Sequence, residues 1–256
     1  MFLDRPVFLN RAAGAATASL LALAAVALPA AASAAIVVAS SGPSASKYPV
    51  GTKIAPDTRV TLKAGDSVTV LDDAGTRVLR GEGTVRVDQR GGGAVSSAFT
   101  ALTRQRSASR VRTGAVRGSD AGEVRSPNLW YVDARQGGTV CILDTWSVQV
   151  WRATSDAAQT LRVTPARAGS GGESAGETAL SFPAGAMIAP WDTSAAPIAD
   201  GSAYRISGDG AAARQVTFAV LPAKPASPEA TAALLIEKGC SVQLDLLAAS
   251  LARGAG

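Results

Sequence analysis

Short hydrophobic segments alternate with turn residues along most of the chain, which is typical of antiparallel β structure. In residues 67–71, valines alternate with hydroxyl side chains, as in a strand with one buried face. The next four residues, Asp72 to Gly75, have the composition of a tight hairpin turn. We therefore predict a small antiparallel β module over residues 35–90.

Longer β segments resume in the second half of the chain. Gln136-Gly137-Gly138 separates two apolar segments, and we expect a hairpin there. Trp146 has the parity of two neighbouring valines and is expected in the core, whereas Trp151 has the opposite parity and is expected to be partly exposed. Many short strands with turn residues between them predict a larger β-sandwich-like or open-barrel domain over residues 128–226.

The C-terminal segment, residues 227–253, changes to a helical pattern. Ser227 precedes a proline and a glutamate, the order expected at a helix N-terminus, and Gly239 is suited to end that helix. In the residues that follow, Leu244, Leu247 and Leu251 fall on one helical stripe. We predict a pair of helices packed on the C-terminal β domain, in a protein that is mainly β.

Residues 91–127 are rich in glycine, arginine and serine and are predicted to connect the two β domains. We expect one short helix there, over residues 97–106, with Phe99 and Leu102 as its apolar positions. Residues 104–125 hold six arginines against two acids and few apolar side chains, so we predict a poorly ordered segment that trypsin cuts into two folded fragments.

The N-terminus has the order of a secretory signal peptide. Charged residues up to Arg11 precede an apolar run, and Ala32-Ser33-Ala34 offers a small-residue cleavage site. We predict a signal peptide over residues 1–34 and a periplasmic or secreted protein. The alternative is an uncleaved membrane anchor, because no charge occurs between Arg11 and Lys47.

Composition removes several classes of chemistry. The 256 residues carry a formal net charge of +5 and include no histidine and only two cysteines. Serine or cysteine nucleophiles that need an imidazole base are therefore excluded, and so are the usual zinc and iron–sulfur sites. We predict no catalytic residues, metal site or cofactor. If the protein is a hydrolase, it must use carboxylates alone, and Asp133 and Asp144 are then the candidates.

The two cysteines, Cys141 and Cys240, are predicted to form a disulfide. An exported chain with two cysteines most simply pairs them, and this bond would fasten the helical tail to the second β domain. The alternative is two buried free thiols.

Two further groups of side chains are candidates for binding. Trp151, Trp191 and Trp130 could offer rings to a sugar or a peptide, against the alternative that they pack in the core. Arginines of the connector could contact an anionic surface, against the alternative that they reflect coding bias. The arginines chosen are Arg104, Arg106, Arg110 and Arg112. With an exported destination, nucleic acid is not an expected partner.

Part of the N-terminal module resembles a known family. The run Leu62-Lys63-Ala64-Gly65-Asp66-Ser67-Val68-Thr69-Val70, followed by Gly75-Thr76-Arg77-Val78-Leu79, is similar to FecR-like periplasmic β domains. The resemblance covers roughly residues 50–90. It implies an exported sensing or scaffolding module and brings no catalytic residues with it.

Together these observations predict an exported envelope module for binding, sensing or scaffolding, without catalytic activity. Its partner would be an envelope protein or a glycan. The alternatives are a carboxylate-dependent glycan hydrolase and a purely structural surface protein.

Overall fold

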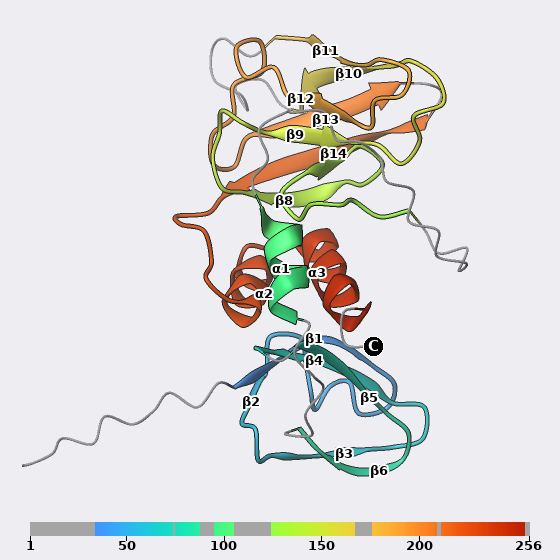
Figure 1. Cartoon of the computed structure of the whole chain (residues 1–256), viewed down its shortest axis with the longest axis vertical. Helices are drawn as coiled ribbons and strands as arrows, with labels where there is room; N and C mark the ends of the chain where they lie inside the picture. The colour runs from blue at the N-terminus through green and yellow to red at the C-terminus, as the bar shows by residue number, and fades with distance from the viewer. Residues whose placement is uncertain are drawn as a thin grey trace, which may run out of the picture. The chain divides into compact units, whose positions relative to one another are not determined.

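The chain folds mainly as β structure (Figure 1), as the sequence predicts. A computed structural model describes residues 34–73, 75–87, 95–104, 124–166, 176–208 and 211–253. The predicted signal peptide, apart from Ala34, lies outside these residues.

The N-terminal strands are β1 (Ala35–Ser41), β2 (Lys53–Ile54), β3 (Arg59–Leu62), β4 (Ser67–Asp72), β5 (Gly75–Arg80) and β6 (Gly83–Arg86). The C-terminal strands are β7 (Val132–Asp133), β8 (Gly138–Ile142), β9 (Gln149–Trp151), β10 (Gln159–Pro165), β11 (Thr178–Phe182), β12 (Ile188–Pro190), β13 (Ala203–Gly208) and β14 (Ala211–Val220). The helices are α1 (Val95–Thr103), α2 (Pro228–Glu237) and α3 (Ser241–Arg253).

The N-terminal strands form two antiparallel sheets around one small core. The larger sheet has the order β2-β1-β4-β5, and β3 pairs with β6 in the other. The predicted hairpin is confirmed, because Asp72 pairs with Gly75 across a two-residue turn. Gly75 has a φ of 126°, a backbone conformation that residues with a Cβ rarely adopt.

Strand β1 is buried on both of its faces. Its first four residues, Ala35 to Val38, are each at most 3% exposed. Ala35 and Val37 belong to the core of the N-terminal module, whereas Ile36 and Val38 pack with the helices. Its apolar residues therefore form an unbroken run instead of an alternation.

The C-terminal strands form a β-sandwich-like pair of sheets. One sheet has the order β11-β10-β13-β14-β8 and the other the order β12-β9-β7. Both contribute to a single hydrophobic core that includes Val150 from the small sheet and Phe218 from the large one.

The hairpin predicted at Gln136-Gly137-Gly138 is wrong, because the strands on either side of it belong to different sheets. Strand β7 pairs with β9, and β8 pairs in parallel with β14, where Val140 lies opposite Phe218. The parallel pairing with β14 places Ile142 in the sandwich core. The turn residues therefore lead the chain from one sheet to the other.

The C-terminal helical pair is present as predicted. The Ser227 side chain accepts a hydrogen bond from the backbone N–H of Ala230, and Gly239 ends the helix with a φ of 73°. The leucine stripe of α3, which comprises Leu244, Leu247 and Leu251, is buried. None of the described helices is long and apolar enough to cross a membrane.

The helices contact more of the protein than the sequence predicts. Their core cluster includes Cys141 and Leu221 from the C-terminal β domain, and it also includes Ile36 and Leu71 from the N-terminal sheet. The helical pair therefore buries apolar surface of both β modules instead of one.

Helix α1 matches the short helix expected in the connector, with Phe99 and Leu102 both buried. The last carbonyl groups at its C-terminal end accept hydrogen bonds from the segment that follows the Arg-rich residues. Leu129 N–H donates to the Leu102 carbonyl at 3.0 Å, and Trp130 Nε1 donates to the Thr103 carbonyl at 3.2 Å. Residues 105–123, for which poor order is predicted, lie outside the described residues.

Candidate functional site

Two of the three tryptophans predicted as a ligand surface lie in the core. Trp151 is 1% exposed and Trp191 is 5% exposed. Trp191 makes edge-on contacts with Tyr204 and Phe218, each at 5.2 Å between ring centroids, and the Arg135 guanidinium covers the ring of Trp151 at 4.9 Å. The expectation that these two rings face a ligand is wrong, because Trp191 belongs to the core between the two sheets and Trp151 is buried with the Arg135 side chain over its ring.

Trp146 shows the reverse error. It is predicted in the core, and it is the most exposed of the large hydrophobic side chains described, at 78%. Strand β9 begins only at Gln149, so the alternation of the strand does not extend back to Trp146. Instead, Asp144 Oδ1 accepts hydrogen bonds from the backbone N–H groups of Trp146 and Ser147, at 3.1 and 2.7 Å. This turn fixes the backbone that presents the indole to solvent.

A cavity of about 310 Å³ lies beside this turn, and we name it the Trp146 cavity. The residues that line it come from the end of β8, from the loop between β8 and β9, from β9 and from the segment before β7. They include Trp130, Tyr131, Asp144, Trp146 and Gln149. Trp130, the third predicted tryptophan, is 6% exposed and therefore contributes only a small part of its ring to the wall.

Gln149 is the unusual member of this wall. It is 8% exposed, and none of the residues that the structure describes gives a hydrogen-bond partner to its buried Oε1. Gln149 begins the central strand of the small sheet, with β12 on one side and β7 on the other. Buried polar atoms are nearly always paired in folded proteins, so this oxygen is an exception, and its burial keeps it out of contact with the cavity.

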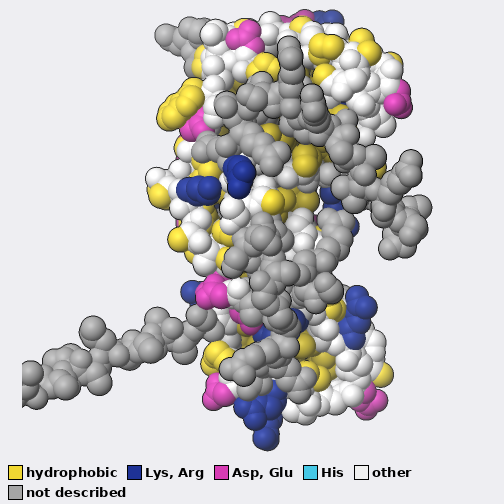
Figure 2. Space-filling model, viewed as in Figure 1, with side chains coloured by type: hydrophobic (Ala, Val, Ile, Leu, Met, Phe, Trp, Pro, Cys, Tyr) yellow, Lys and Arg dark blue, Asp and Glu magenta, His cyan; other side chains and the backbone are white. Residues whose placement is uncertain are grey.

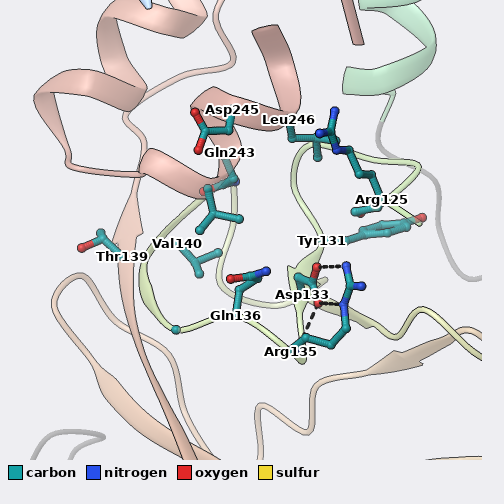
Figure 3. A pocket seen from close by; sticks show the side chains of 13 residues that line it. Arg125, Tyr131, Asp133, Arg135, Gln136, Thr139, Val140, Gln243, Asp245 and Leu246 are labelled. Atoms are coloured by element: carbon teal, nitrogen blue, oxygen red, sulfur yellow. Dashed lines mark hydrogen bonds and ion pairs between the residues drawn. The ribbon is translucent and has the colours of Figure 1, made fainter. Parts of the chain in front are cut away.

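A second cavity, of about 220 Å³, lies between α3 and the β7–β8 connection (Figure 3). Arg135 holds both oxygens of Asp133 in its wall, with Nη2 at 2.8 Å from Oδ2 and Nε at 3.1 Å from Oδ1. Burial raises the pKa of Asp245 in the same wall, and the positive charge of Arg125 partly opposes this shift. The opposite charges in this cavity are largely matched within the protein itself.

The two candidate catalytic carboxylates line different cavities. Asp133 lines the cavity between α3 and the β7–β8 connection, and Asp144 lines the Trp146 cavity. Asp133 fixes Arg135, and Asp144 holds the turn before β9. Within the part of the chain that the structure describes, no three or more Cys, Asp and Glu side chains lie together in a way that could hold a metal ion.

Of the arginines predicted to contact an anionic surface, the structure describes Arg104 alone. Its side chain is exposed, and its backbone carbonyl accepts a hydrogen bond from Asn128 Nδ2 at 2.7 Å. Arg106, Arg110 and Arg112 lie outside the described residues. On the face shown in Figure 2, the basic and acidic side chains of the described residues are interspersed.

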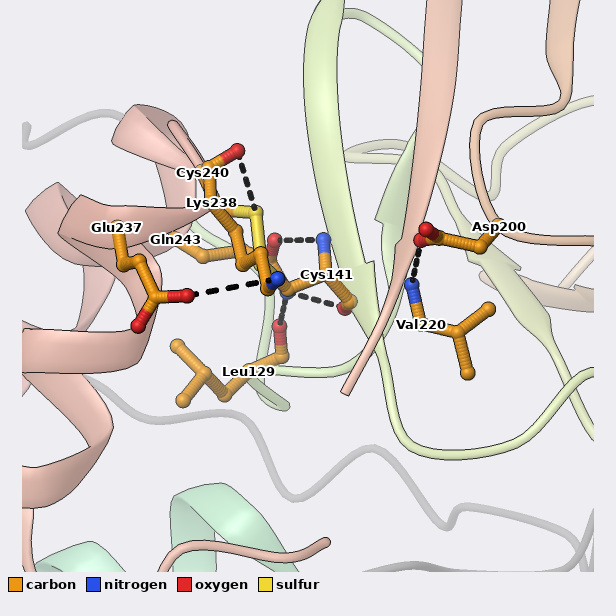
Figure 4. Close-up of a disulfide and its surroundings, with 8 residues drawn as sticks. All are labelled: Leu129, Cys141, Asp200, Val220, Glu237, Lys238, Cys240 and Gln243. Carbon is orange, nitrogen blue, oxygen red and sulfur yellow. Dashed lines mark hydrogen bonds and ion pairs between the residues drawn. A yellow bond between two sulfur atoms is a disulfide. The ribbon is translucent and has the colours of Figure 1, made fainter. Parts of the chain in front are cut away.

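The predicted disulfide is confirmed. Cys141 in β8 and Cys240 just before α3 are bonded, with their Cα atoms 5.9 Å apart (Figure 4). Beside the bond, Gln243 is 4% exposed and uses its amide as a strand neighbour would use a peptide group. Its Oε1 accepts from Cys141 N–H at 2.7 Å, while its Nε2 donates to the carbonyl groups of Cys141 and Leu129, at 2.8 and 2.7 Å.

Sequence reasoning therefore identified the disulfide but not the exposed indole or the two buried glutamines. The Asp144–Ser147 spacing, an acid followed three residues later by a serine, is a turn signature that would have moved Trp146 out of the strand. Nothing in the sequence distinguishes Gln149 or Gln243 from a surface glutamine. The chain matches no protein-family model, and neither a curated protein nor a solved structure matches it.

Proposed function

We propose that this protein is an exported envelope module that binds a partner molecule at the Trp146 cavity and catalyses no reaction. The observation that carries the proposal is the exposed indole of Trp146, which a hydrogen-bonded turn holds at a cavity of about 310 Å³. A large apolar ring gains free energy when a partner covers it, and tryptophan is prominent among the residues that dominate binding energy.

The exported location in this proposal is supported by two features. The disulfide between Cys141 and Cys240 is typical of proteins that fold in an oxidising compartment. The N-terminal residues have the order of a secretory signal, and residues 50–90 resemble FecR-like periplasmic β domains.

Binding is favoured over carboxylate-dependent hydrolysis by what the two candidate acids do. Glycoside hydrolysis needs two carboxyl groups facing one scissile bond. Asp133 is held by Arg135 in one cavity, whereas Asp144 accepts three hydrogen bonds at its Oδ1 from the Trp146 turn at another. Each carboxylate therefore has a local structural partner in its own cavity.

The test compares the full-length protein with Trp146→Ala. Envelope polysaccharide and envelope protein fractions are immobilised separately, and the binding of each variant is titrated. We expect the substitution to weaken binding by about tenfold or more, since a tryptophan that a partner buries contributes about 1–2 kcal/mol or more to the binding free energy. Val78→Ala is the matched control, because Val78 is also exposed, at 41%, but lies in β5. Equal binding by the wild-type protein and Trp146→Ala would overturn the proposal.

A further inference from the structure

We infer that the cavity between α3 and the β7–β8 connection binds a free α-amino acid, with the ammonium group at Asp245 and the carboxylate at Arg125. This site is separate from the Trp146 cavity, and the inference goes beyond the proposed function. It rests on two charged side chains that have no partner among the described residues, on the balance of charge in the wall and on the apolar residues beside them.

Asp245 and Arg125 are the charged side chains of this wall that the fold leaves unsatisfied. Within the part of the chain that the structure describes, neither side chain makes a hydrogen bond or an ion pair, yet the charge of Arg125 is near enough to lower the pKa of Asp245, which burial raises. The two side chains lie on either side of Leu246 in Figure 3. Both residues are exposed, so a ligand can reach them from solvent.

The balance of charge in the wall selects a ligand that carries both charges. Two acids and two arginines line the cavity, and Arg135 already holds both oxygens of Asp133, at 2.8 and 3.1 Å. A cation or an anion would leave one of the other two side chains without a counter-charge, and an uncharged ligand would leave both so. A zwitterion compensates both and leaves the cavity neutral.

The remaining wall residues fit an α-amino acid. Such a ligand carries its two charges on one carbon, so it can bridge opposite charges that are near each other without being in contact. Its side chain then meets the apolar residues Val140, Val242 and Leu246. Gln136 and Thr139, whose side chains have no partner among the described residues, offer further hydrogen bonds. The volume of about 220 Å³ is below the usual range for drug-sized ligands, which suits one amino acid and not a peptide.

The test titrates the full-length protein with leucine, valine and glycine by calorimetry. Leucine amide lacks the carboxylate, N-acetylleucine lacks the ammonium group, and phosphoethanolamine is a zwitterion of another class. We expect leucine and valine to bind more tightly than glycine, because their side chains bury apolar surface. We expect both leucine derivatives to bind about tenfold or more weakly than leucine, because each loses one charged contact.

Asp245→Asn and Arg125→Gln each remove one charge and keep much of the side-chain shape. Each should weaken the binding of leucine by about tenfold or more and should leave the unfolding midpoint within a few degrees of the wild type, because both residues are exposed. If a variant fails to fold, the two leucine derivatives test the same charges from the ligand side. Asp156→Asn and Arg205→Gln are the matched controls, because these exposed residues lie outside the cavity, and they should bind leucine as the wild type does.

Several results would overturn the inference. These are the absence of amino-acid binding by the wild type, undiminished leucine binding by Asp245→Asn or Arg125→Gln, and binding of a leucine derivative or of phosphoethanolamine as tight as that of leucine. Trp146→Ala should bind leucine as the wild type does, so the inference and the proposed function fail separately. Loss of leucine binding in Trp146→Ala would show that this cavity is not a separate site.

Discussion

Gln243 lies in the first turn of α3, and three backbone groups accept from or donate to its carboxamide. The amide accepts from Cys141 N–H and donates to the carbonyl groups of Cys141 and Leu129, all within 2.8 Å. All three residues are at least nine-tenths buried. Because β8 is the last strand of its sheet, this side chain supplies partners that a further strand would otherwise supply.

Replacement of Gln243 by leucine should therefore destabilise the protein strongly. Leucine keeps most of the volume but leaves two carbonyl groups and one N–H without these partners, each at a cost of about 1–3 kcal/mol before relaxation. We expect a loss of about 2–4 kcal/mol in the free energy of unfolding, measured by urea denaturation. Gln215→Leu, at an exposed position, should change it by less than about 0.5 kcal/mol. Similar effects of the two substitutions would contradict this account.

The lowered pKa of Asp66 predicts how the stability of the N-terminal module depends on pH. Burial raises the pKa of this 3%-exposed carboxyl, but hydrogen bonds from Ser44 and from Lys63 N–H outweigh the burial and hold the pKa below its ordinary value of 3.8. The ionised form is therefore favoured in the folded state. Its stabilising effect is complete above the unfolded-state pKa and is lost as the pH falls through the folded-state pKa.

The measurement is the unfolding free energy of the wild type minus that of Asp66→Asn, followed from pH 7 to pH 3 or so. We expect this difference to be constant near neutrality and to shrink as the pH falls below about 4. The subtraction removes the contributions of the other carboxyl groups. A difference that grows on acidification would show that the sign is wrong.

At the scale of elements, the C-terminal end of α1 is completed by residues more than twenty positions further along the chain. The carbonyl groups of Leu102, Thr103 and Arg104 accept hydrogen bonds from Leu129 N–H, Trp130 Nε1 and Asn128 Nδ2, at 3.0, 3.2 and 2.7 Å. These are the carbonyl groups that a helix end leaves without partners. Residues 128–130 therefore lie beside residues 102–104, at the end of α1.

Residues 105–123 should therefore be dispensable for folding. Since Arg104 and Asn128 are already in contact, a short Gly/Ser linker can join residue 104 to residue 124 without straining either side. We expect the linker variant to unfold within a few degrees of the wild type in calorimetry. Asn128→Ala, in contrast, should lower the unfolding free energy by about 1–2 kcal/mol, because it removes the bond from Asn128 Nδ2 to the Arg104 carbonyl and the bond that Asn128 Oδ1 accepts from Trp130 N–H. An unfolded linker variant would show that the replaced residues stabilise the fold.

At the scale of the whole molecule, the two β modules share a core. Ile36, Val38 and Leu71 lie in the same cluster as Phe99, Leu129 and the helical leucines. The sequence predicts two domains that fold independently, whereas the shared cluster indicates that each β module buries apolar surface of the other part. Two fragments produced by cleavage in residues 105–123 would each expose part of this cluster if they separated, and exposed apolar clusters of this kind favour association.

Trypsin cleavage at the arginines of residues 105–123 should therefore leave the two fragments together. The disulfide cannot hold them, because Cys141 and Cys240 both lie on the C-terminal side of the cut. We expect the cleaved protein to elute as one species in gel filtration, with or without reducing agent, and to separate only in denaturant. Elution of two folded fragments in buffer would instead support the independent domains that the sequence predicts.

The features that the sequence determined are those set by a few consecutive residues, or by a residue type that occurs only twice. The β4–β5 hairpin follows from Asp72–Gly75, and the limits of α2 follow from Ser227 and Gly239. Such turns and caps are chosen by local backbone geometry. The disulfide follows from there being only two cysteines in the chain.

Tertiary structure alone decided the features that depend on distant partners. The parallel pairing of β8 with β14 joins segments about eighty residues apart, and no local pattern encodes the choice. The same holds for the candidate site. Trp151 and Trp146 exchange their expected environments, because the folded chain buries Trp151 with Arg135 over its ring and a turn exposes Trp146. Gln149 became notable only when its surroundings left Oε1 without a partner. Exposure and hydrogen-bond pairing are properties of the assembled core, which the order of residues specifies only through the fold.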